Sequence, residues 1–307
     1  MNYILKTNSI TKKYGNFTSL NGLTMNIPKN SIYGFIGKNG AGKTTLIRVI
    51  CGLQKPTNGD YKLLGVNNKN SEINNVRRHI GAIIESPALY MDMNAEDNLK
   101  QRCRTLGISQ DKISKILSLV GLENTGKKEV KNFSLGMRQR LGIAMALCGD
   151  PEFLILDEPI NGLDPQGIIE VRNLIRKLNQ EYNITILISS HLLDELAKIA
   201  THYGFIDNGM ILKEMSADEL RKYFRDYIRL KVTNINILKT YLESKNISYS
   251  FSEDQYINIY EKIDFSEFVV ELYNYGCKIV AISECSETLE NFFIKLIKEN
   301  ENEKSAI

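Results

Sequence analysis

The segment GKNGAGKT, residues 37–44, is the feature that most restricts how this chain can fold. It fits the phosphate-binding pattern G-x-x-x-x-G-K-[ST], with an apolar strand pattern before it and a helical pattern after it. Gly40 and Gly42 allow successive backbone N–H groups to converge on phosphate oxygens at the N-terminus of the helix. Lys43 is placed to reach the β- and γ-phosphates, and the Thr44 hydroxyl to coordinate Mg²⁺. The segment therefore predicts an α/β fold that binds a nucleoside triphosphate.

A second motif, FLILDE at residues 153–158, supplies carboxylates for the same site. The run is continuously apolar, as expected for a buried parallel strand, and it ends in Asp157 and Glu158. Two adjacent carboxylates at this position need partners, because burying an unpaired charge is costly. We expect Asp157 to bind Mg²⁺ and Glu158 to polarise the water that attacks the γ-phosphate. The guanine-binding element N-K-x-D is not matched, since NNKN at 67–70 lacks the aspartate, so we expect ATP, with Tyr14 stacked on adenine.

Composition and charge argue against several other classes of protein. The formal net charge of +3 over 307 residues is too small to favour a nucleic-acid partner. The five cysteines are scattered without a C-x-x-C pair, which indicates reduced thiols in a cytosolic protein. The N-terminus lacks the apolar core of a signal peptide, and no apolar run approaches the roughly 18 residues that span a bilayer. We therefore expect a cytoplasmic chain that acts at a membrane through a partner.

The segment NFSLGMRQRLGIA, residues 132–144, predicts a second helix start suited to an anion. Ser134 is the expected N-cap, and Gly136 leaves the first turn without a bulky side chain. Leu141, Ala144, Met145 and Cys148 recur at helical spacing, so we expect one buried face. A second anion site in a chain with a sufficient phosphate loop raises the question of which phosphate it meets.

The order and spacing of five motifs resemble the ATP-binding cassette of ABC transporters over about residues 3–220. These motifs are the phosphate loop, SLGMRQR, LDEP, NGLDP and SSH. The resemblance matches Tyr14 to the adenine-stacking aromatic and assigns the Walker A loop to Gly37, Lys38, Asn39, Gly40, Ala41, Gly42, Lys43, Thr44 and Thr45. It matches Asp157 and Glu158 to Walker B, Ser134 and Gly136 to the signature, Asp164 to the dimer-contacting loop and His191 to the switch histidine. In that family two cassettes pack head to tail, so the signature helix would close over the ATP of the other chain.

Two departures from the family pattern bear on function. The signature is usually Leu-Ser-Gly-Gly-Gln and here reads FSLGM, which keeps the serine and the glycine expected to touch phosphate. Transport ATPases usually have glutamine where this chain has Glu85, in IGAIIESPALYMDMNAEDNL. This stretch and the C-terminal extension look like the branch that exports peptide antibiotics of the bacitracin and lantibiotic type. We expect Glu85 to lie near Mg²⁺ and to contribute to catalysis.

The pattern of the chain indicates two domains. We expect residues 1–221 to form the ABC-type P-loop NTPase domain, an α/β fold with an inserted helical subdomain at about 90–150. Residues 222–307 are expected to form a small α+β domain of order βαββαβ plus a helix. There, Ile228, Leu230 and Val232 should share one strand face, two strands should meet at an EDQ turn, and Gly276 should end a helix. That helix should bury Phe265, Phe268, Val269, Leu272 and Tyr273.

These observations together favour the ATP-hydrolysing subunit of an ABC exporter of peptide antibiotics. The expected partners are an integral-membrane permease and a second copy of the cassette, with ATP and Mg²⁺ as cofactors. The chain would then lie on the inner face of the cell membrane, held there by the permease. The alternatives are the ATPase of another ABC transporter, whether drug exporter or importer, and a permease-free ABC-type assembly ATPase.

Overall fold

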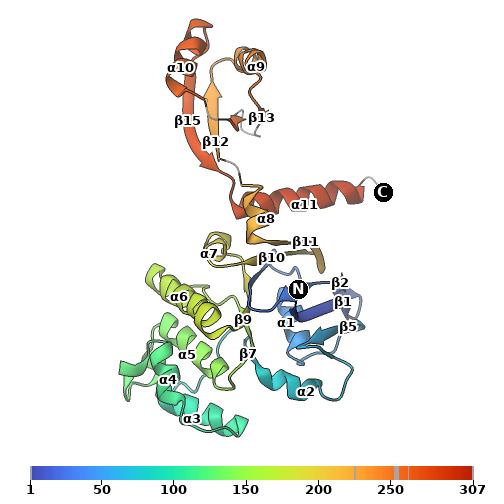
Figure 1. Cartoon of the computed structure of the whole chain (residues 1–307), viewed down its shortest axis with the longest axis vertical. Helices are drawn as coiled ribbons and strands as arrows, with labels where there is room; N and C mark the ends of the chain where they lie inside the picture. The colour runs from blue at the N-terminus through green and yellow to red at the C-terminus, as the bar shows by residue number, and fades with distance from the viewer. Residues whose placement is uncertain (1, 225, 252–255, 262, 306–307) are drawn as a thin grey trace. The chain divides into compact units, whose positions relative to one another are not determined.

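The computed structural model describes residues 2–224, 226–251, 256–261 and 263–305. The chain forms two compact units (Figure 1). The first contains Met1–Ala217 together with Leu296–Ile307, and the second contains Asp218–Lys295. No helix in the described part of the chain is both long enough and apolar enough to span a bilayer.

The first unit is built around a six-stranded sheet in the order β11-β10-β4-β9-β8-β7. Its strands are β4 (Ile32–Ile36), β7 (Ile80–Ile83), β8 (Phe153–Asp157), β9 (Thr185–Ser190), β10 (His202–Asp207) and β11 (Met210–Ser216). All neighbours pair in parallel except β10 and β11. Every residue of β4, β8 and β9 is buried, which explains their continuous apolar sequences. The parallel arrangement brings the carboxyl ends of these three strands to one edge of the sheet, where α/β proteins bind ligands.

A second sheet covers part of the same core. It consists of β1 (Tyr3–Tyr14), β2 (Phe17–Leu23), β3 (Asn26–Pro28), β5 (Asn58–Leu63) and β6 (Val66–Asn67), all paired antiparallel. Helix α1 (Lys43–Ile50) packs in the core between the sheets, and α2 (Ile73–Val76) and the 3₁₀ turn η1 (Arg77–His79) follow. Helix α6 (Pro165–Tyr182) connects β8 to β9, and α7 (Leu193–Ala197) follows β9.

The predicted helical subdomain is present as α3 (Ala95–Leu106), α4 (Ile113–Leu119) and α5 (Leu135–Leu147), with 3₁₀ turns η2 (Glu123–Thr125) and η3 (Val130–Asn132). The expectation that α5 buries one face was too narrow. Leu141, Ala144 and Cys148 are buried, but so are Ile143 and Leu147. The cause is that α5 contacts β7, α3, α4 and α6, so nearly its whole circumference is covered.

The second unit confirms the predicted βαββαβ order followed by a helix. Its elements are α8 (Ala217–Arg221), β12 (Asp226–Val232), α9 (Ile235–Ser244), β13 (Tyr249–Phe251), β14 (Ile257–Ile259), α10 (Phe265–Asn274) and β15 (Ile279–Ser286). The last helix, α11 (Leu289–Ser305), begins in this unit, and its residues from Leu296 onward belong to the first unit. The sheet order is β13-β14-β12-β15. The predicted EDQ turn lies outside the described residues.

Side-chain burial in this unit agrees with the predicted pattern at most positions. Leu230 and Leu272 are in its core, and Gly276 follows α10 with a φ of +76°, as a C-terminal glycine should. The expectation that Tyr273 is buried was wrong, because its side chain is 64% exposed. Tyr273 follows Leu272, which with Phe268 forms the buried face of α10, and its phenol group tolerates solvent.

Candidate active site

The phosphate loop connects β4 to α1 at the carboxyl edge of the six-stranded sheet. Gly40 and Gly42 have φ values of +81° and +109°, a conformation that side chains with a Cβ rarely adopt. A Cβ at Gly37 would lie 2.6 Å from the carbonyl oxygen of Ile206, and one at Gly42 would lie 2.7 Å from that of Ser19. Residues 38–40 are exposed, whereas Ala41 is buried. The backbone of the loop therefore packs closely against the carbonyl groups of Ile206 and Ser19, while residues 38–40 face solvent.

Lys43 lies inside this loop. Its side chain is 7% exposed, and its Nζ donates to the carbonyl oxygens of Gly37 at 2.6 Å and Lys38 at 3.2 Å. Burial lowers the pKa of Lys43, and the nearby carboxylates of Glu158 and Asp157 oppose that shift. The ammonium group therefore lies at the centre of the loop, where phosphate oxygens can replace the carbonyl groups.

Asp157 joins the phosphate loop to β8 and β9. Its side chain is 2% exposed, and Oδ2 accepts a hydrogen bond of 2.9 Å from the Thr44 hydroxyl. The Ser189 hydroxyl donates to Oδ1. Thr44 and Asp157 offer neutral and anionic oxygens to one point beside the phosphate loop, the donor chemistry that Mg²⁺ prefers. Sequence reasoning missed Ser189, although a serine at the end of the apolar run ITILISS was a usable signal.

Glu158 and His191 form a second pair at the same edge. Glu158 follows the last residue of β8 with a φ of +52°, and its N–H donates to the carbonyl oxygen of Ser189 at 3.0 Å. Its carboxylate lies 2.7 Å from His191 Nδ1 and accepts from the His191 backbone N–H at 3.4 Å. A non-glycine residue in this strained conformation is common at functional sites. The two contacts with His191 hold the Glu158 carboxylate against the imidazole.

Tyr14 is the last residue of β1, and Thr45 lies in the first turn of α1. The Tyr14 ring is 43% exposed, its hydroxyl donates to Gln54, and the Lys12 ammonium lies 5.2 Å from the ring centroid. The Thr45 hydroxyl lies 2.8 Å from that of Ser19. The Tyr14 ring therefore has a free surface, which stacking on a base requires.

The structure places Glu85 against α1. Its carboxylate is 2.6 Å from Arg48 Nη2, and its φ is +62°. Among the described residues it forms no hydrogen bond with Thr44 or Asp157. That Glu85 lies near Mg²⁺ stays a prediction about the protein with ATP and the metal ion bound. Sequence reasoning also missed Arg48, because a surface arginine on an amphipathic helix carries no distinguishing signal.

The signature residues form a separate cluster. Ser134 is the N-cap of α5, with Oγ accepting from the Met137 N–H at 3.2 Å. Asp164 is the N-cap of α6 and accepts from the Gly167 N–H at 3.1 Å. A Cβ at Gly136 would lie 3.6 Å from Gly167 Cα, so the two helix N-termini are adjacent. Within the described part of the chain, neither cap forms a hydrogen bond with the phosphate loop.

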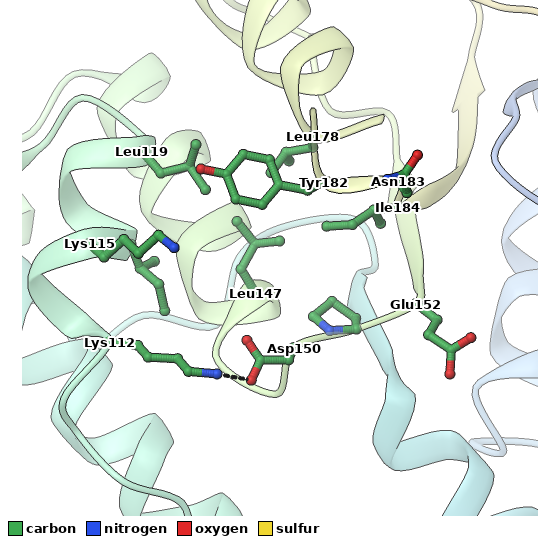
Figure 2. Close-up of a pocket in the computed structure, with 12 residues that line it drawn as sticks. Lys112, Lys115, Leu119, Leu147, Asp150, Glu152, Leu178, Tyr182, Asn183 and Ile184 are labelled. Atoms are coloured by element: carbon green, nitrogen blue, oxygen red, sulfur yellow. Dashed lines mark hydrogen bonds and ion pairs between the residues drawn. The ribbon is translucent and has the colours of Figure 1, made fainter. Parts of the chain in front are cut away.

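A cavity of about 490 Å³ lies near the opposite ends of β8 and β9 (Figure 2). Leu147, Leu178 and Ile184 form its apolar wall, and Lys112 pairs with Asp150 at its rim. None of the predicted nucleotide-binding residues lines it. The predicted site is therefore the open phosphate loop and not this cavity.

Comparison with known proteins extends these observations. The sequence model of the family described as ABC transporter matches residues 20–161. The chain is 42% identical over 302 residues to the bacitracin transport ATP-binding protein BcrA of Bacillus licheniformis, covering 97% of this chain and 98% of that protein. It is 46% identical over 215 residues to the lantibiotic transport ATP-binding protein SrtF of Streptococcus pyogenes, covering 70% of this chain and 92% of that protein. Among solved structures, cbiO1 from Clostridium perfringens, described as part of the ABC transporter complex cbiONQ, aligns with a TM-score of 0.66 at 26% identity, covering 80% and 97% of the two chains.

Proposed function

This chain belongs to the ATP-binding proteins of ABC transporters and is an ATPase, and we propose that it drives the export of a peptide antibiotic. The observation that carries this proposal is the match to BcrA along nearly the whole chain, including the C-terminal unit. The match to SrtF covers 70% of the chain. We therefore propose bacitracin-type peptides ahead of lantibiotics as the cargo.

In the proposed reaction each site residue has one task. The loop N–H groups and Lys43 bind the β- and γ-phosphates, and Tyr14 stacks on adenine. Glu158 orients the attacking water and accepts its proton, while His191 holds the Glu158 carboxylate and stabilises charge on the γ-phosphate. Ser189 keeps Asp157 in place through its hydroxyl.

We further propose Mg²⁺ as the cofactor, because Thr44 and Asp157 converge as oxygen donors beside the phosphate loop. When bound, the ion neutralises charge that develops on the phosphate oxygens. Glu85 is proposed to act near it, after separating from Arg48.

The paired helix N-termini at Ser134 and Asp164 support a second copy of the cassette as partner. Their free N–H groups and small neighbours Gly136 and Gly167 suit an anion, but this chain's own phosphate loop is already complete. The proposed dimer therefore contains two composite ATP sites, each with the loop of one chain and the signature helix of the other.

We propose that an integral-membrane permease carries the cargo and holds this chain at the inner face of the membrane. Residues 1–221 would be the ATPase domain, and residues 222–307 a second domain that contributes to packing or dimerisation. The rival functions are an importer or another drug exporter, and an assembly ATPase without a permease.

Expression of the chain with its native permease in a bacitracin-sensitive host tests the proposal. We expect a several-fold rise in the inhibitory concentration of bacitracin, and no rise when Glu158→Gln replaces the native chain. Protection against a lantibiotic alone would reassign the cargo. Absence of any membrane protein in the purified complex would favour the assembly ATPase.

A further inference from the structure

The cavity of about 490 Å³ lies between α4, the C-terminal ends of α5 and α6, and the residues that precede β8 and β9 (Figure 2). The phosphate loop, Asp157 and Glu158 lie at the opposite, carboxyl ends of the parallel strands. The volume is within the range of about 300 to 1,000 Å³ that is typical of small-molecule sites. We call this space the α4–α6 cavity, and ask which ligand its lining fits.

The floor of the α4–α6 cavity is apolar. The buried side chains that form it are Ile116, Leu147, Pro151, Leu178 and Ile184. Helix α4 packs on α3 and α5. Leu119 is half-buried at the mouth, and Tyr182 is 40% exposed there. A ligand with an apolar body would remove this surface from water, which favours binding.

The charged side chains at the rim form pairs, with one exception. Lys112 pairs with Asp150, and Glu152 lies 3.6 Å from Lys29. Lys115 forms no ion pair or hydrogen bond with any residue in the described part of the chain. The lining therefore has one positive charge that no carboxylate compensates.

Lys115 and Tyr182 direct polar groups into the cavity from opposite walls. Lys115 follows Lys112 by three residues and precedes Leu119 by four, so the three side chains share one face of the helix. Figure 2 shows Lys115 extending from α4 into the cavity and Tyr182 extending across it from the end of α6 toward Leu119. Among the described residues the Tyr182 hydroxyl has no hydrogen-bond partner. An ammonium and a phenol hydroxyl arranged in this way can both donate to one carboxylate.

We propose that the α4–α6 cavity binds a single-chain aliphatic carboxylate. Its chain lies on the apolar floor, and its carboxylate accepts hydrogen bonds from Lys115 and Tyr182. Charge complementarity selects a monoanion, because a second negative charge would be repelled by Asp150 and Glu152 and a cation by Lys115. The limited volume favours one chain over the two chains of a phospholipid. This inference does not depend on the identity of the transported peptide.

Isothermal titration calorimetry of the full-length chain with decanoate, below its critical micelle concentration, tests the proposal. We expect one site per chain. Lys115→Ala should weaken binding roughly tenfold, Lys115→Glu should weaken it further, and Tyr182→Phe should weaken it roughly fivefold. Lys115→Arg should retain most of the affinity. The matched control is Lys177→Glu, at an exposed lysine of α6 that does not line the cavity, and it should bind decanoate like the native chain.

Two related ligands separate the contribution of the charge from that of the chain. Decanol has the same chain without the charge, so it should bind the native chain as weakly as decanoate binds Lys115→Ala, and Lys115→Ala should not weaken it further. Octanoate should bind roughly tenfold more weakly than decanoate, because two fewer CH₂ groups are buried. Saturating ATP should change the affinity for decanoate by no more than about twofold, because the two ligands occupy separate sites.

Four results would overturn the proposal. Equal losses in Lys115→Glu and Lys177→Glu would show that general surface charge explains binding. Loss of decanoate binding when ATP is added would place the carboxylate in the phosphate loop. Lys115-dependent binding to phosphatidylglycerol vesicles, without binding of decanoate, would replace the free acid by a lipid. If the native chain binds neither decanoate nor these vesicles, the cavity has no such ligand, while the proposed transport function stands.

Discussion

Replacement of Glu158 by glutamine is the sharpest test of the proposed chemistry. The substitution removes the negative charge and the proton-accepting ability while keeping nearly the same shape. In the described part of the chain the Glu158 carboxylate is hydrogen-bonded to His191 and forms no hydrogen bond with the phosphate loop. A glutamine oxygen can still accept the backbone N–H of His191, so the local fold should persist. The change therefore isolates the carboxylate.

The expected loss follows from the role assigned to the carboxylate. General-base catalysis contributes typically about 10² to 10⁴ in rate, which corresponds to roughly 3 to 5.5 kcal/mol of transition-state stabilisation. Binding should not fall in parallel, because Lys43 and the loop N–H groups remain. Removing a negative charge near the γ-phosphate should leave ATP affinity unchanged or raise it by a small factor.

The assay has two parts. Phosphate release at saturating ATP and Mg²⁺ gives the turnover, and titration with a fluorescent ATP analogue gives the affinity. Glu181→Gln, the same substitution at an exposed residue near the end of α6, is the control and should behave like the native enzyme. Turnover of Glu158→Gln within about threefold of native, well short of the general-base range, would refute the assignment of the base. A loss of ATP affinity as large as the loss of turnover would show a binding role instead.

Three further predictions follow from other parts of the structure. Ser134→Arg should abolish hydrolysis by blocking the dimer while leaving ATP binding to the dilute monomer intact. Lys43→Ala should weaken the binding of ATP to the monomer itself. If a nucleotide titration shows that both variants weaken this binding equally, the cross-chain site is contradicted. Glu85→Gln should preserve nucleotide affinity but change the ratio of Mg²⁺-supported to Mn²⁺-supported turnover. If metal preference, turnover and resistance in cells are all unchanged, Glu85 only spaces the loop and has no role at the metal. Tyr33→Phe should lower the free energy of unfolding in urea by roughly 1.5 to 3 kcal/mol, because the buried Tyr33 hydroxyl donates to Glu214 at 2.6 Å. Burial and Glu214 raise the pKa of Tyr33, so this contribution should persist up to about pH 10 and fade only above it.

The catalytic edge of the sheet was predictable because short motifs define it locally. The phosphate loop needs glycines at fixed positions, and positive φ at Gly40 and Gly42 is the reason. The apolar runs that end at Asp157 and before His191 indicated strands whose carboxyl ends meet. Each of these signals is contained in a few consecutive residues, so no knowledge of the tertiary fold was required.

Contacts between distant segments were not predictable in this way. Ser189 binds Asp157 from a strand 32 positions later, and Arg48 reaches Glu85 across 37 positions. Neither residue type is unusual where it stands. The extent to which α5 is buried was underestimated for a related reason, since periodicity reports one preferred face and not how many neighbours the helix has.

The strength of the contacts around Glu85 limits how ATP could act on the proposed permease. The pair between Arg48 and Glu85 has side chains 37% and 64% exposed, so it contributes at most about 1 kcal/mol. Breaking it can shift a two-state equilibrium by only about fivefold, whereas near-complete switching needs about 5.5 kcal/mol. The contact of Pro87 with Gly142 is different, because close packing against the α5 backbone transmits displacement rather than charge. We therefore infer that the pair between Arg48 and Glu85 only adjusts the coupling between ATP and the partner. Most of this coupling would come from movement of α5, whose N-cap Ser134 would meet the ATP of the second chain.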